Sequence, residues 1–461
     1  MFYYPIPIAV RHTSRVAVAL VAAVLICGGI AASSACAEMV EIAPAERLRI
    51  NTKLRSKVET TRLEAIERLA QSPSVDSLRL LIDAGLADSA ETVQLAACRA
   101  VVQFVEQPEL REALQQRLLR ESQAAQPNPV AVTLLRVALQ TLSANEPIPN
   151  DDWFNTKFVI TRHAAPLAIM LADQLASRAE RTDVPTLVNL LRTKLAESFP
   201  VRRAAVQTLT RIEAVEAIEA LIAELPRFSG ETLLDAVEYL QLVTQQRLTD
   251  SAHWSQWWQA NKATFEFPWP LVRPRGRTIL NTPVAAGEST YYGMPIYAKR
   301  VVFVLDGSGS MSGVKLAKAQ DELAQAIVRL PADVHFGIVV FNSDVLRWRP
   351  ALVPAERGNK DAALQFVRRI VAQNNTSTFP ALQTALGYDA EAAYLLTDGV
   401  PSSGRIVAPP AIVATITQQN RLHRQSIYTI GVGADIAGPE FATFLRTLAE
   451  SNRGAYRSVE P

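Results

Sequence analysis

Oxygen-bearing side chains follow a short apolar segment at residues 301–305. Asp306, Ser308 and Ser310 occupy alternate positions, and glycines stand between them. Residues 301–305 are all apolar, as in a strand that is buried on both faces, so the polar group stands at the carboxyl end of a predicted strand. One carboxylate and two hydroxyls on a glycine-relaxed loop can turn toward a common point. They supply the hard oxygen ligands that Mg²⁺, Ca²⁺ and Mn²⁺ accept, which indicates a divalent-cation site.

The segments around this loop alternate between strand-like and helix-like patterns. A helix is predicted directly after the loop, at residues 314–330. Strands are predicted at 334–341, 427–432 and 455–459, and helices at 361–371, 380–386, 410–424 and 439–449. This order predicts an α/β, doubly wound, Rossmann-like parallel sheet, in which ligands bind at the carboxyl ends of the strands.

On these residues the carboxyl-terminal third resembles the von Willebrand factor A family. The metal-ion-dependent adhesion site of that family uses D-x-S-x-S on a first loop, Thr on a second and Asp on a third. The family's Thr lies five residues before an Ala-Leu pair, and Thr376 stands in that relation to residues 381–382, with Thr378 as the alternative. Asparagines at 374–375 stand where the family usually has two glycines, and they tolerate a left-handed backbone. Asp398 follows an apolar run and matches the third loop.

The resemblance implies one bound cation, with Mg²⁺ preferred over Ca²⁺ or Mn²⁺. The implied ligand set is Asp306, Ser308, Ser310, Thr376 and Asp398. In that arrangement the three hydroxyls contact the ion directly and the two carboxylates act through water. One coordination position stays open, and an acidic residue of a partner protein fills it. Because two carboxylates offset the charge of the dication, the incoming carboxylate is not repelled.

The middle of the chain shows helical periodicity with an internal repeat. Residues 134–142 resemble residues 201–209, and four weaker copies begin at Thr61, Val93, Leu167 and Thr232. Five of the six copies have Ala at the fifth position, where a small side chain lets a neighbouring helix approach closely. The region resembles HEAT-like repeats, which form an all-α solenoid with an extended protein-binding surface. An irregular helical bundle is the alternative.

The first residues resemble an export signal. Arg11 and Arg15 precede an apolar run at 16–32, and residues 35–37 offer an A-x-A cleavage site. The signal predicts a periplasmic or secreted protein. An uncleaved membrane anchor is the alternative, and only then do we expect membrane contact. The expected organisation is multidomain: signal peptide 1–37, amino-terminal segment 38–57, helical repeats 58–262, linker 263–299 and α/β domain 300–461.

Charge and histidine content argue against two classes of function. The chain has 47 basic residues, two of them in the predicted signal, so 45 basic residues face 45 acidic residues in the remainder. No basic field is left to attract nucleic acid. The histidines after residue 37 have no H-E-x-x-H spacing, and none lies near the three loops. We therefore expect binding and no catalysis.

These patterns predict an exported, adhesion-type interaction protein. Its metal site and its helical repeats would engage partner proteins or the cell surface. Two alternatives remain: an accessory subunit resembling those of metal chelatases, which bridges to an ATPase, and a scaffold whose metal only stabilises the loops.

Overall fold

The structure is a computed structural model that describes residues 42–86, 88, 90–104, 107–123, 165–268, 271–274, 276–277, 289–433 and 438–460. The described residues fall into two compact units, one within Met1–Leu167 and one within Ala168–Pro461. The predicted signal at 1–37 and the repeat copy at 134–142 lie outside the described residues. None of the described helices combines the length and apolar composition needed to cross a membrane.

The first unit is helical in its described part. It contains α2 (Pro44–Leu54), α3 (Glu59–Ala70), α4 (Val75–Leu80) with a π-helical turn at Leu81–Gly85, α5 (Glu91–Phe104) and α6 (Pro108–Gln123). Helix α3 packs against both α2 and α5. A Cβ atom added at Gly85 would lie 2.5 Å from the Cβ of Ala97, so this contact requires glycine. Ala97 is the fifth residue of a repeat copy, and a neighbouring segment does approach it closely.

The second unit begins with six more helices: α9 (Ala165–Arg178), α10 (Val184–Leu191), α11 (Phe199–Leu209), α12 (Val215–Glu224), α13 (Gly230–Thr244) and α14 (Ser251–Asn261). The helical character predicted from the periodicity is confirmed in the described residues. Each of the five described repeat copies falls on a helix, and all their fifth positions are buried: Ala65, Ala97, Leu171, Ala205 and Ala236. That the copies stack as a HEAT-like solenoid remains a prediction.

A mixed sheet follows, with strand order β5-β4-β3-β7-β8-β9. Its strands are β3 (Arg300–Asp306), β4 (His335–Phe341), β5 (Val345–Arg347), β7 (Ala392–Thr397), β8 (Ser426–Val432) and β9 (Tyr456–Val459). The five longer strands are parallel, as predicted. Two short segments, β5 and β6 (Val353–Pro354), pair antiparallel with β4. The sequence did not predict them, because two or three residues are too few to show a strand periodicity.

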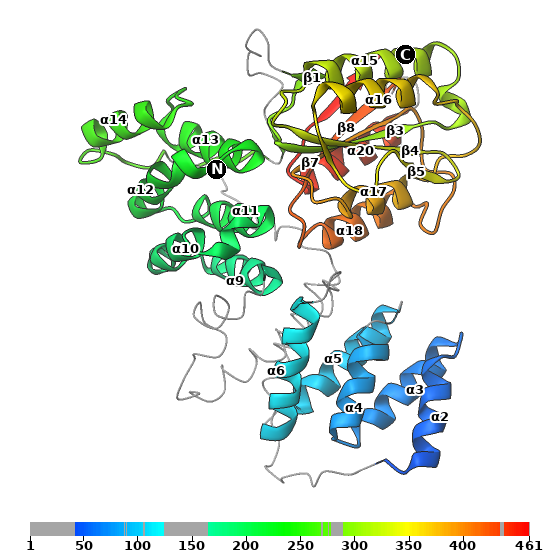
Figure 1. Cartoon of the computed structure of the whole chain (residues 1–461). Helices are drawn as coiled ribbons and strands as arrows, with labels where there is room; N and C mark the ends of the chain where they lie inside the picture. The colour runs from blue at the N-terminus through cyan, green and yellow to red at the C-terminus, as the bar shows by residue number, and fades with distance from the viewer. Residues whose placement is uncertain are drawn as a thin grey trace, which may run out of the picture. The chain divides into compact units, whose positions relative to one another are not determined.

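Helices cover both faces of this sheet (Figure 1). One face packs against α15 (Val314–Arg329) and α16 (Arg357–Arg368), and the other against α17 (Thr378–Leu386), α18 (Pro409–Gln419) and α20 (Pro439–Ser451). The side chains of β3 alternate between the two layers: Val301, Phe303 and Leu305 contact the first, and Val302 and Val304 the second. Burial on both faces explains the unbroken apolar run of this strand.

Part of the predicted linker belongs to the packed domain. Strands β1 (Thr290–Tyr291) and β2 (Met294–Pro295) form a hairpin at residues 290–295. The ring of Tyr291 lies 5.3 Å from that of Phe303 and is 1% exposed. The domain therefore begins before residue 300. The composition suggested a linker because turn residues flank the tyrosines, but the aromatic rings bury enough apolar surface to join the core.

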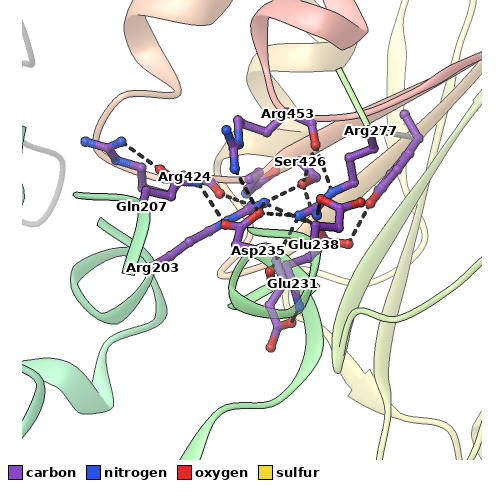
Figure 2. A network of polar contacts seen from close by, with 12 residues as sticks. Arg203, Gln207, Glu231, Asp235, Glu238, Arg277, Arg424, Ser426 and Arg453 are labelled. Atoms are coloured by element: carbon purple, nitrogen blue, oxygen red, sulfur yellow. Dashed lines mark hydrogen bonds and ion pairs between the residues drawn. The ribbon is translucent and has the colours of Figure 1, made fainter. Parts of the chain in front are cut away.

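A buried ionic network joins the helices to the sheet within the second unit (Figure 2). Arg203 of α11 donates from Nε to Asp235 of α13 at 2.7 Å and from Nη2 to Ser426 of β8 at 2.8 Å. Glu231 of α13 accepts from Ser426 at 2.6 Å and from Arg277 at 2.7 Å. Arg203, Glu231 and Asp235 are at most 2% exposed. Helices α9–α14 thus belong to the same unit as the sheet. The sequence instead predicted a separate helical domain that ends at residue 262.

The network contacts the amino-terminal ends of the strands. Ser426 is the first residue of β8, and Glu391, which directly precedes β7, accepts from the backbone N–H of Glu231 at 3.1 Å. Loops at the carboxyl ends of these parallel strands lie at the opposite edge of the sheet. The helices and the predicted metal loops therefore use opposite edges.

Candidate metal centre

Two adjacent strands bring the predicted carboxylates to one edge of the sheet. Asp306 is the last residue of β3, and Asp398 directly follows β7. The two strands are parallel neighbours, with Leu305 opposite Leu396. The polar residues at their carboxyl ends are therefore close in space, although about 90 residues separate them in the chain.

Hydrogen bonds connect four of the five predicted ligands. Asp306 is fully buried and accepts from the backbone N–H of Ser308 at 2.8 Å. The hydroxyls of Ser308 and Ser310 share a hydrogen bond of 3.1 Å, and Ser310 donates to Oδ1 of Asp398 at 2.6 Å. The first and third loops thus form one polar cluster.

The second loop is attached to the other two mainly through its backbone. The N–H of Gly309 donates to the carbonyl of Asn374 at 2.9 Å, and the N–H of Thr376 donates to the hydroxyl of Ser402 at 3.0 Å. Asn374 has φ +63°, the left-handed conformation that asparagine tolerates. Thr376 is 5% exposed, whereas Thr378 is fully buried and its hydroxyl has no partner among the described residues. The preference for Thr376 as ligand stays a prediction.

The donor set suits a hard cation. Carboxylate and hydroxyl oxygens lie within hydrogen-bonding distance of one another, and such oxygens are the ligands that Mg²⁺, Ca²⁺ and Mn²⁺ prefer. Within the described ranges no group of three or more His, Cys, Asp or Glu side chains is placed to hold a metal. A cation bound at this edge would thus depend on the hydroxyls as well as on the two carboxylates.

Three polar residues of the cluster were not identified from sequence. Thr397 donates to Oδ2 of Asp306 at 2.5 Å, and Ser402 accepts from the second loop. Lys315, in the first turn of α15, forms an ion pair of 2.6 Å with Oδ2 of Asp398. Thr397 and Ser402 lie close to Asp398 in the chain, so their proximity to a predicted ligand could have identified them. Lys315 had no such signal, because a lysine at the start of a helix usually points into solvent.

Asp306 has an unusual protonation equilibrium. The pKa of Asp306 is raised to about 6, mainly by burial and to a smaller extent by the nearby charge of Asp398. Hydrogen bonds from Thr397 and Ser308 act in the opposite direction and lower it. In an unfolded chain the same carboxyl has a pKa near 3.8. Below about pH 6 the metal-free folded protein therefore holds a proton on Asp306, and a cation must displace it.

We expect cation affinity to fall as the pH drops through about 6. Because one proton is displaced, Mn²⁺ should bind about tenfold more weakly at pH 5 than at pH 7, as measured by calorimetric titration. The metal-free protein should show the opposite trend: the folded state binds the proton more tightly than the unfolded state, so its stability rises as the pH falls from about 6 toward 3.8. Equal affinities at both pH values, with the protein folded at each, would contradict a protonated Asp306.

Residues 301–460 match the family model described as von Willebrand factor type A domain. The chain is 30% identical over 180 residues to inter-alpha-trypsin inhibitor heavy chain H4 of Homo sapiens, covering 36% of this chain and 19% of the relative. It is 27% identical over 180 residues to heavy chain H3 of Mus musculus, covering 36% and 20%. The match thus spans about a fifth of these relatives. A solved von Willebrand factor type A structure from Catenulispora acidiphila aligns with a TM-score of 0.31 and 23% identity, over 35% of this chain and 38% of that one.

Proposed function

Because residues 301–460 form a von Willebrand factor type A domain, we propose that the chain is an exported protein that binds partner proteins through a divalent cation at this domain. The observation that supports the proposal is the hydrogen-bonded cluster of Asp306, Ser308, Ser310 and Asp398 at the carboxyl edge of β3 and β7. Separate strands and loops supply these oxygens, and the sheet holds them together. A cation at this cluster would meet a largely preformed set of ligands.

The proposed interaction is a carboxylate of the partner completing the shell of the cation. Mg²⁺ is the favoured ion, since it accepts few protein oxygens and retains water or an exchangeable ligand. Two protein carboxylates leave little net charge on the loaded site, so an Asp or Glu side chain can approach it. The helical repeats would add a second protein-binding surface.

The proposed role is binding rather than turnover, in the periplasm or outside the cell. Among the described residues, His335 lies at the start of β4 and His423 follows α18, away from the ligand loops at the ends of β3 and β7. A chelatase-type accessory role would require the protein to be found beside a cytoplasmic ATPase. A purely stabilising metal would be recognised if Asp398→Ala lowered the unfolding temperature but left partner binding unchanged.

Calorimetric titration of the purified protein with Mg²⁺, Ca²⁺ and Mn²⁺ tests the proposal. We expect one equivalent of cation to bind. Thr376→Val removes one hydroxyl ligand and should weaken binding about tenfold. The matched variant Thr378→Val should bind like the wild type, and it should be no less stable, because it removes a buried hydroxyl without a partner.

Partner binding provides the second part of the test. Proteins captured from envelope extract should be released by chelator and recovered when Mg²⁺ is restored. The proposal is wrong if the wild type takes up none of the three cations. If Thr378→Val rather than Thr376→Val weakens binding, the site exists but the assigned threonine is wrong.

A further inference from the structure

Lys315 contacts the polar cluster at the predicted metal site, and its neighbours in the sequence give no reason to expect this contact. Its ammonium lies 2.6 Å from Oδ2 of Asp398, whose side chain is fully buried, while the lysine side chain is 32% exposed. Ser310 donates to the other oxygen of the same carboxylate at 2.6 Å. Both oxygens of Asp398 therefore have partners within the protein.

The location of this lysine is unfavourable by itself. Lys315 is the second residue of α15, and the first turn of that helix contains no acidic residue. A positive charge at a helix amino terminus is repelled by the helix dipole. The buried carboxylate of Asp398 offsets this repulsion, and the lysine in turn supplies the charge partner that a buried carboxylate needs.

Without a bound cation, the ionised side chains of the cluster carry more negative than positive charge. Asp306 and Asp398 are two buried carboxylates, and within the described ranges Lys315 is the one ammonium paired with them. No described residue forms a salt bridge with Asp306. A dication at the cluster would act on the same carboxylate that Lys315 occupies, and the two positive charges would repel each other at short range.

We infer that Lys315 is a built-in counter-cation that competes with the divalent metal for Asp398 and thereby lowers the affinity of the site for the metal. The inference rests on the proposed function, since it presumes that a cation binds here. With a dication bound, Lys315 and the metal carry three positive charges against two carboxylates. The excess of one positive charge is what a single incoming carboxylate neutralises, so the lysine favours acidic partners over neutral ones.

Titration of Lys315→Met with Mn²⁺ tests the inference. This change keeps the length and apolar part of the side chain and removes the charge. We expect Mn²⁺ to bind at least about tenfold more tightly than to the wild type, because the competing charge is gone and Asp398 lacks a counter-ion. The matched control is Lys318→Met on the same helix. The ammonium of Lys318 donates to the carbonyl of Glu460, so the affinity of this variant should stay within about twofold of wild type.

Thermal unfolding adds a second readout, in which the metal-free stability and the stabilisation by metal are measured separately. In chelator, Lys315→Met should unfold at a lower temperature than the wild type, and saturating Mn²⁺ should raise its unfolding temperature by more than it raises that of the wild type. Lys315→Arg, which retains the charge, should resemble the wild type in both respects.

The outcomes separate this inference from the proposed function. If the wild type binds Mn²⁺ and Lys315→Met binds equally or more weakly, the inference fails and the metal site stands. If only Lys315→Met binds, the competition between Lys315 and the metal is supported, but the proposed function fails because the wild-type site takes up no cation. If neither binds, the proposed function fails and the inference falls with it.

Discussion

Replacing Asp306 with asparagine is expected to abolish the binding of divalent cations while the domain stays folded. Asparagine has nearly the same shape, but it brings no negative charge to the cluster. Removing a residue that acts on the metal through a ligand costs about 10- to 100-fold in affinity, and Asp306 also supplies one of the two negative charges that offset the dication, so its loss should cost more than about 100-fold. Calorimetric titration with Mn²⁺ at pH 7 measures the effect.

The fold should tolerate this substitution because the carboxylate is costly to bury. Its pKa is raised to about 6, mainly by burial, so the charged form is disfavoured in the folded protein. In chelator, Asp306→Asn should therefore be at least as stable as the wild type. Asp361→Asn, at an exposed position of α16, serves as the matched control and should bind cation normally. Wild-type affinity in Asp306→Asn would show that the cluster is not the binding site.

Replacing Arg203 with alanine should lower the free energy of unfolding of the second unit by about 3–5 kcal/mol. The guanidinium is fully buried and donates to the side chains of Asp235, Glu231 and Ser426 and to the carbonyl of Arg424. Its removal leaves buried carboxylates short of a counter-ion. Burial alone would raise the pKa of Asp235, but Arg203, Arg277 and Arg453 hold it well below its usual value, so this carboxyl is charged in the folded state.

Denaturant unfolding, followed by circular dichroism and tryptophan fluorescence, measures the loss. The wild-type helices α9–α14 and the α/β domain should unfold in one transition, because the network belongs to both. Arg357→Ala is the control: that side chain is 97% exposed and pairs weakly with Asp361 at 4.0 Å, so the variant should match the wild type. Separate transitions for helices and sheet in the wild type would contradict a shared core.

The network also explains why the α/β domain and α9–α14 belong together. Tyr428 of β8 donates to Oε1 of Glu231 at 2.8 Å, and its ring stacks on that of Tyr394 with centroids 4.6 Å apart. Without α13 the hydroxyl of this buried tyrosine would lose its acceptor. A fragment that starts at residue 300 would expose these groups and lose the hairpin that contains Tyr291.

Local patterns in the sequence were sufficient to predict individual strands, loops and helices of this protein. The apolar run at 301–305 predicted a doubly buried strand, and the polar residues after it predicted a ligand loop at its carboxyl end; the structure has β3 and the hydrogen-bonded Ser308 and Ser310 there. Helix periodicity likewise predicted α15 to within one residue. The predictions of the strand and the helix are confirmed because each depends on neighbours within a few positions, where side-chain spacing directly reflects burial. That the loop binds a metal stays a prediction.

Only the tertiary structure decided which distant residues meet. Lys315 and Asp398 are 83 positions apart, and Arg203 and Ser426 are 223 apart. In the sequence, Lys315 and Arg203 are each compatible with a solvated surface position, because nothing near either residue shows that its partner will be buried beside it. Folding brings the partners together, and desolvation then makes the contact strong and specific. For that reason the sequence predicted the metal loops, while the lysine beside them and the ionic network that joins helices to sheet became visible only in the fold.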